Sequence, residues 1–120
     1  MKKRKHPEAD LQRACVKLAA IYEKQGKLRY FAVPNGEKRD AKTGAILKAM
    51  GVRAGVPDIE LLAYKRTLYV ELKADEKGTF SKDQKDWRDW LISNGHGYAT
   101  THTLNGFQRI MDSFVMGDTP

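Results

Sequence analysis

Hydrophobic side chains first recur three to four residues apart along the chain, which is the period of an amphipathic helix. Pro7 and Glu8 favour a helix start, because proline is tolerated in the first turn and an acid suits the positive helix N-terminus. Gly26 ends the pattern. We therefore predict a helix between these points, with a buried stripe made of Leu11, Cys15, Leu18, Ile21 and Tyr22.

Segments rich in aromatic and β-branched residues follow, and they predict strands. The first covers residues 29–33 and ends in turn chemistry at Pro34-Asn35-Gly36. Two more cover residues 58–62 and 67–72, and only a short polar link at Tyr64-Lys65-Arg66 separates them. This spacing predicts an antiparallel hairpin.

Helical signals surround these strands. Residues 45–50 form the end of a short helix stopped by Gly51, and residues 104–114 form the last helix. Ser81 with Gln84 three positions on has the arrangement of a capping box, which starts another helix. That helix stops at Asn94-Gly95, and a last strand follows at residues 98–101. The element order predicts an α/β fold, a four-stranded mixed sheet flanked by helices.

The helix that follows Ser81 carries both tryptophans of the chain. Trp87, Trp90 and Leu91 lie on one side of it, so we predict that both indoles belong to the core. The alternative is an exposed tryptophan that stacks on an unpaired base.

Composition sets the scale of the fold. The chain has 120 residues, 41% hydrophobic and 31% charged, which suits one compact domain with its own core. We assign residues 6–115 to this domain, residues 1–5 to a disordered basic tail and residues 116–120 to a second tail. A single cysteine excludes an intrachain disulfide and a zinc site built from cysteines. Cys15 is predicted to be a buried structural thiol.

Charge points to a class of partner. The net charge of +7 favours a polyanion, most often nucleic acid, although it also serves solubility. The basic start of the chain is not followed by an apolar stretch, and no run approaches the ~20 apolar residues of a membrane helix. We therefore expect no secretory signal, no membrane span and a cytoplasmic protein.

The candidate chemistry lies in Pro57-Asp58 and Glu71-Leu72-Lys73. Asp58 opens the first hairpin strand and Glu71 ends the second, so the two should lie on strands about 5 Å apart. Glu71 and Lys73 are two positions apart and share a face of their strand. The hairpin is therefore predicted to gather two carboxylates and an ammonium at one end of the sheet.

This set suits metal-dependent phosphodiester hydrolysis. Mg²⁺ takes hard oxygen ligands, usually one or two carboxylates together with waters and phosphate oxygens. Asp58 and Glu71 are the candidate ligands, with the main-chain carbonyl of Leu72 as a third. Lys73 would orient the attacking water or stabilise charge in the transition state. The alternative is structural, because Pro-Asp is a common turn and Glu-x-Lys suits a solvated strand face.

Several motifs together resemble the VRR-NUC family, the virus-type replication-repair nuclease domain of the PD-(D/E)xK nucleases. They are EADLQ at residues 8–12, VPNG at 33–36, GVRAGVPD at 51–58, ELK at 71–73 and SKDQKDW at 81–87. The likeness runs from about residue 8 to residue 101. One departure is visible, since the family's name reflects an arginine pair and Arg53 is followed here by Ala54.

The resemblance implies a restriction-endonuclease-like core and two more active-site residues. Glu8 matches a helix carboxylate that completes the acidic cluster and contributes to the metal site. The alternative is an acid that only favours the helix dipole. Gln84 matches a glutamine that reaches the active site, while the alternative is its capping box.

The resemblance also implies a substrate. It indicates a structure-selective DNA endonuclease that acts in DNA repair on branched DNA, such as four-way junctions or flaps. Mg²⁺ would be the cofactor, with Mn²⁺ as a substitute, and the protein would be a homodimer from a bacterial or phage-infected cell. Candidate DNA contacts are Asn35, Lys38, Arg39 and Arg53, for which a turn and a solvated basic loop are the alternatives.

Two other functions are compatible with the same residues. The first is a nucleic-acid-binding module that keeps this fold without cutting DNA. The second is a sequence-specific restriction-type enzyme, for which a chain of 120 residues leaves little room for a base-reading insertion.

Overall fold

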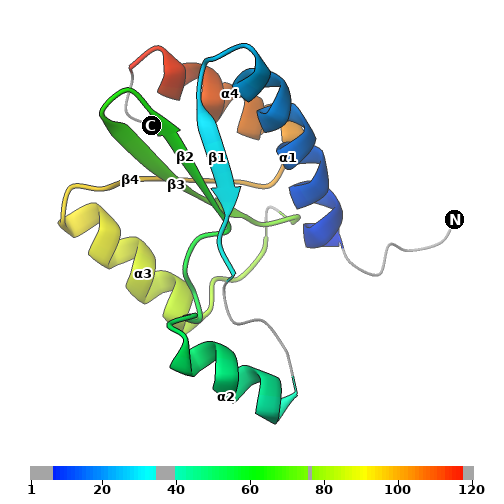
Figure 1. Cartoon of the computed structure of the whole chain (residues 1–120), viewed down its shortest axis with the longest axis vertical. Coiled ribbons are helices and arrows are strands. Elements are labelled where there is room, and N and C mark those ends of the chain that lie inside the picture. Colours follow the sequence, from blue (N-terminus) through cyan, green and yellow to red (C-terminus); the bar gives the residue numbers. More distant parts are fainter. Residues whose placement is uncertain (1–6, 35–39, 76, 118–120) are drawn as a thin grey trace, which may run out of the picture.

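The computed structural model describes residues 7–34, 40–75 and 77–117. Within these ranges the helices and strands follow the predicted order (Figure 1). The helices are α1 (Pro7–Lys24), α2 (Ala41–Ala49), α3 (Lys82–Ser93) and α4 (Leu104–Val115). The strands are β1 (Arg29–Ala32), β2 (Ile59–Ala63), β3 (Arg66–Leu72) and β4 (Gly97–Thr101). The assigned tails at residues 1–5 and 116–120 lie outside the described residues, apart from Met116 and Gly117.

The four strands form one mixed sheet in the order β1-β2-β3-β4. The strand β2 is antiparallel to both β1 and β3, and β4 is parallel to β3. The hairpin predicted from the short link between residues 62 and 67 is β2–β3, with Leu61 opposite Leu68. The α/β class with a mixed sheet flanked by helices is therefore confirmed.

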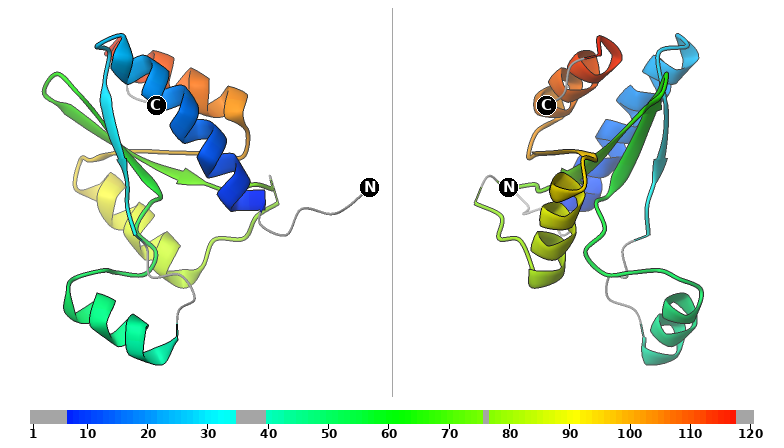
Figure 2. Two further views of the ribbon diagram at one scale, coloured as in Figure 1. Left: turned by 45° about the vertical axis from the view of Figure 1, so that its right-hand side comes forward. Right: turned by 90° about the vertical axis from the view of Figure 1, so that its left-hand side faces the viewer.

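One face of the sheet holds the hydrophobic core. The helices α1 and α4 pack against each other over this face (Figure 2). Because side chains alternate along a strand, Leu68, Val70 and Leu72 point into this core while Tyr69 and Glu71 point to the opposite face. The other buried core residues are Cys15, Ala19, Tyr22, Leu28, Ile59, Leu61, Ala99, Phe107, Met111 and Phe114.

The apolar stripe of α1 is narrower than predicted. Cys15 and Tyr22 are buried as expected, and burial raises the pKa of the Cys15 thiol, as befits a structural cysteine. Ile21 is 53% exposed, so its assignment to the buried stripe is wrong. At 3.6 residues per turn, Ile21 lies about 120° around the helix from Cys15, and Ala19 takes its place in the core.

The prediction that both tryptophans belong to the core is also wrong. Trp90 is 55% exposed and Trp87 is only half-buried. The buried residue of α3 is Leu91, and its chain neighbour Trp90 points about 100° away from it around the helix. The third predicted member of this side, Leu91, does pack inside the protein.

Local signals fix the helix ends. Asp40 caps α2, because its carboxylate accepts a hydrogen bond from the Thr43 N–H at 2.8 Å. This cap starts α2 four residues before the segment at 45–50 that the sequence indicated.

In the described part of the chain, no helix has the length and apolar character to cross a membrane.

Candidate active site

The hairpin brings Asp58 and Glu71 together at one end of the sheet, as predicted. Asp58 directly precedes β2 and is 9% exposed, whereas Glu71 lies near the end of β3 and is 2% exposed. The Leu72 N–H donates a hydrogen bond of 2.8 Å to Asp58 Oδ2. The main chain of β3, the strand that carries Glu71, therefore holds the Asp58 carboxylate in place. On its other side, the Asp58 carbonyl accepts a hydrogen bond of 2.8 Å from the Val33 N–H.

The two carboxyl groups interact with each other. Burial raises the pKa of Glu71 to about 9, and a hydrogen bond with Asp58 and the charge of Asp58 act in the same direction. The charge of Lys73 opposes this rise, while the charge of Glu8 adds to it. The Asp58–Glu71 pair therefore favours retention of a proton when no cation is present. A buried pair of this kind fits a hard divalent cation, which takes oxygen donors and displaces such a proton.

Lys73 reaches the same end of the sheet and is held by α3. Its Nζ donates a hydrogen bond of 2.9 Å to Gln84 Oε1. The Gln84 Nε2 in turn lies 3.5 Å from Glu71 Oε2. Gln84 thus links the ammonium and the buried carboxyl, and it joins the predicted site across a sequence separation of more than ten residues.

The capping role of Gln84 is present as well. The Ser81 N–H donates to Gln84 Oε1 at 2.9 Å, and the Gln84 N–H donates to Ser81 Oγ at 3.1 Å. The two readings of this glutamine are therefore compatible, because one oxygen accepts from both Ser81 and Lys73. The capping box fixes the side chain that positions Lys73.

Three aromatic or basic side chains near the site were not singled out from the sequence. The Phe80 ring lies between two cations, with Lys73 Nζ 5.2 Å and Arg88 Cζ 5.6 Å from its centroid. Burial raises the pKa of Tyr98, and the charge of Glu71 adds to this rise while that of Arg88 opposes it. None of these residues belongs to a spacing motif, so only the packing of α3 on β4 reveals them.

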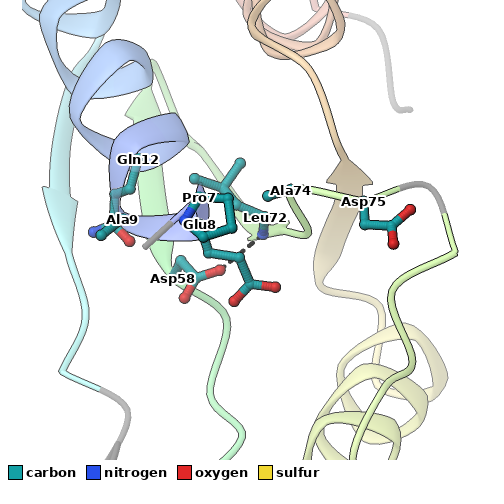
Figure 3. A pocket seen from close by; sticks show the side chains of 8 residues that line it. All are labelled: Pro7, Glu8, Ala9, Gln12, Asp58, Leu72, Ala74 and Asp75. Carbon is teal, nitrogen blue, oxygen red and sulfur yellow. Dashed lines mark hydrogen bonds between the residues drawn. The ribbon is translucent and has the colours of Figure 1, made fainter. Parts of the chain in front are cut away.

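Glu8 lies with Asp58 at a pocket of about 400 Å³. Figure 3 shows the start of α1 over the end of the hairpin, with the Glu8 and Asp58 side chains lining the same hollow. Glu8 is exposed, in contrast to the buried Asp58. Asp75 lines the pocket from the other side, and its carboxylate also accepts a hydrogen bond from the Lys77 N–H at 2.9 Å. The remaining lining residues are Pro7, Ala9, Gln12, Leu72 and Ala74.

The candidate DNA contacts are only partly placed. Asn35, Lys38 and Arg39 lie outside the described residues. Arg53 is exposed and does not line the pocket of Glu8 and Asp58, since its guanidinium Cζ lies 5.0 Å from the centroid of the Trp87 ring. Arg53 therefore lies next to α3, against the Trp87 ring.

The end of the sheet unites two buried carboxyl groups, an ammonium and an amide. Among the described residues, no group of three or more His, Cys, Asp or Glu side chains is arranged to hold a metal ion. The two carboxylates are nevertheless a side-chain set that Mg²⁺ sites commonly use, with water and phosphate oxygens as further ligands. Comparison of the chain with protein-family models, with curated proteins and with solved structures finds no match in any of the three.

Proposed function

We propose that this protein is a Mg²⁺-dependent nuclease that hydrolyses phosphodiester bonds of DNA. The observation that carries the proposal is the buried Asp58–Glu71 pair, with Lys73 held beside it by Gln84. A fold of this size does not need two acids buried at one place for its stability. Together with Lys73, they match the needs of a reaction at a polyanionic phosphodiester.

Each residue has a definite part in this proposal. Asp58 and Glu71 hold the cation, and Mn²⁺ substitutes for Mg²⁺ on the same oxygen donors. When bound, the cation supplies Lewis-acid activation of the phosphodiester. Lys73 orients the attacking water and stabilises negative charge that develops on the phosphate oxygens. Gln84 positions the Lys73 ammonium through its hydrogen bond of 2.9 Å.

Two further ligands belong to the proposal. Glu8 lines the pocket together with Asp58, and its exposed carboxylate is free to approach a cation bound there. The main-chain carbonyl of Leu72 is the other, since the N–H of the same residue already contacts Asp58. To bind such a cation, the Glu8 carboxylate would move toward Asp58 and Glu71, since the described residues hold no group of three such side chains arranged for a metal.

The proposed substrate is branched DNA, such as a four-way junction or a flap. The net charge of +7 supports a polyanionic substrate, and the resemblance to the VRR-NUC family supports its branched form. Arg53, together with Asn35, Lys38 and Arg39, would contact the phosphates. We place the protein in the cytoplasm of a bacterial or phage-infected cell, where it would serve DNA repair.

A second candidate is a nucleic-acid-binding module that does not cleave. The observation in its favour is that the buried groups satisfy one another, because Glu71 pairs with Asp58 and Lys73 pairs with Gln84. Such a module needs the charge and the fold but no cation.

Cleavage assays separate the two candidates. Labelled four-way-junction, flap and linear duplex DNA are incubated with Mg²⁺, Mn²⁺ or EDTA and with wild type, Asp58→Ala or Lys73→Ala. We expect cleavage that depends on the metal and prefers branched DNA. Asp58→Ala should abolish it, and Lys73→Ala should lower the rate by about 10²–10³-fold, the usual cost of one charge-stabilising group.

Lys17→Ala is the matched control, because Lys17 is exposed on α1 and its loss lowers the net charge by the same amount. This variant should cut at close to the wild-type rate. DNA binding is measured in parallel in EDTA and should survive Lys73→Ala. Tight binding of junctions with no cleavage under any condition would favour the binding module instead.

A further inference from the structure

Four side chains along α3 contact one another in a row, and three of them, Trp87, Trp90 and His96, have no part in the proposed function. The Trp87 and Trp90 rings meet edge to face, with centroids 6.3 Å apart and planes at 72°. The Arg53 guanidinium Cζ lies 5.0 Å from the Trp87 centroid. At the other end, His96 stacks on Trp90 with a centroid distance of 5.7 Å and an angle of 17°. We call Arg53, Trp87, Trp90 and His96 the stacking ladder.

The ladder is built by a close contact between the loop before Asp58 and α3. Gly55 has φ +86° and lies against the main chain of α3, where a Cβ built on it would be 2.4 Å from the Asp83 carbonyl carbon. This approach sets Arg53 over the Trp87 ring. The same helix carries Gln84 one turn earlier, so the ladder is joined rigidly to the site of Asp58 and Lys73.

Beside the ladder lies a pocket of about 420 Å³, lined by Arg53, Asp86, Trp87 and Trp90. This volume is in the range of small-molecule sites, roughly 300–1,000 Å³. Its lining is two indole rings with one cation and one carboxylate, so the side-chain charges cancel. A flat, uncharged ring suits such a pocket better than a phosphate does. Trp90 does not belong to the hydrophobic core, and it is 55% exposed.

We infer that this pocket stacks one unpaired nucleobase of a DNA strand beside the active site. The inference rests on the proposed function in one respect, that the ligand is DNA. Every base has a π-face that an exposed indole and a guanidinium accept, and the Asp86 carboxylate is an acceptor for base amino groups. The net charge of +7 brings the strand to the protein, and the ladder then favours DNA with unpaired nucleotides over intact duplex.

The test measures binding by the full chain in EDTA, so that cleavage plays no part. A labelled oligothymidylate and a duplex of the same length are titrated against wild type, Trp90→Ala and Trp90→Phe. Trp90→Ala should weaken binding of the single strand about 5- to 150-fold, the usual loss for one stacked base. Trp90→Phe should recover part of it, and duplex binding should change by less than about twofold.

Intrinsic fluorescence gives a second readout, because both tryptophans of the chain belong to the ladder. The oligothymidylate should quench the wild type, and Trp90→Ala should lose most of this quenching. Tyr64→Ala is the matched control. Tyr64 is 81% exposed, its ring lies 5.4 Å from Lys65 Nζ, and it sits at the turn of the β2–β3 hairpin, outside the lining of the pocket.

The outcomes separate this inference from the proposed function. Cleavage that persists while Trp90→Ala binds single strands like wild type would overturn the base subsite and leave the nuclease intact. Selective loss of single-strand binding in Trp90→Ala, in a protein that never cuts, would support the subsite and refute the nuclease. An equal loss for single strand and duplex, or the same loss in Tyr64→Ala, would also overturn the subsite.

Discussion

Among single residues, Glu71 has the most unusual environment. The residue is 2% exposed, and the acid Asp58 is the neighbour that interacts with its carboxyl group most strongly. Burial disfavours the charged form of an acid, so the proton remains on this group far above its ordinary pKa of 4.5. The cost of ionising Glu71 links the stability of the fold to the pH.

This environment predicts a stability that falls with rising pH in EDTA. The unfolded chain releases the Glu71 proton near its ordinary pKa of 4.5, whereas the folded chain keeps it until about 9. The stabilising contribution is therefore complete below about pH 4.5 and is lost progressively as the pH rises to about 9. Melting temperatures measured across this window should decline for wild type.

Glu71→Gln isolates the effect, because the amide keeps the shape of the side chain and does not ionise. We expect its melting temperature to change less over the same pH range and to exceed that of wild type near pH 9. Glu23→Gln, on the exposed end of α1, should behave like wild type. Parallel curves for wild type and Glu71→Gln would contradict the raised pKa.

Among the secondary-structure elements, α3 contributes to both the candidate active site and the stacking ladder. Its first turn carries Ser81 and Gln84, which position Lys73, and its outer side carries Trp87 and Trp90. The loop that leads to Asp58 is held against α3 at Gly55. The position of this helix therefore sets both the active site and the stacking ladder.

Gly55→Ala should destabilise the fold. The added methyl group would meet the Asp83 main chain at 2.4 Å, and the residue has φ +86°, which disfavours a side chain. Overpacking of this kind costs about 1–3 kcal/mol, and a left-handed backbone adds to it. Urea denaturation measures the loss of free energy of unfolding.

Gly44→Ala is the matched control for that substitution. Gly44 lies inside α2, and a Cβ built there has no atom within 4 Å. Alanine is more favourable than glycine in a helix interior. The stability of this variant should therefore be unchanged or higher by up to about 1 kcal/mol. Equal stability of Gly55→Ala and wild type would show that the loop moves away from α3 without cost.

At the scale of the whole molecule, the fold separates a packed body from an exposed helix. The core lies between the sheet and the α1–α4 pair, whereas all nine residues of α2 are at least partly exposed. Ile46 and Met50 leave apolar surface open on and just after α2, at 52% and 75% exposure. A symmetric pair of such molecules would carry two copies of the candidate site.

We therefore predict a homodimer with α2 at its interface. Light scattering after gel filtration should give twice the mass of one chain. Met50→Glu should shift the protein toward the monomer, because a charge would be buried without a partner. Met116→Glu is the matched control, since Met116 is 79% exposed just beyond α4. A monomeric wild type at working concentration would refute the dimer.

The sequence by itself determined the order of the helices and strands and the meeting of two acids at the candidate site. The order of helices and strands follows from apolar periods and from local caps such as Ser81 with Gln84, which act over a few residues. The meeting of Asp58 and Glu71 follows from a short hairpin, whose register a tight link fixes. In both cases the physical cause is local, so it is readable without the fold.

Only the tertiary structure decided how the helices bury, position and flank the residues of that site. The burial that raises the pKa of Glu71, the bond from Lys73 to Gln84 and the exposure of Trp90 all depend on how α3 docks on the sheet. Glu8 reaches the pocket because α1 crosses the end of the hairpin. Such packing joins segments far apart in the chain. The period of hydrophobic residues in the sequence shows which face of a helix is apolar. It does not show which side chains at the edge of that face are left exposed by the neighbouring helices and strands.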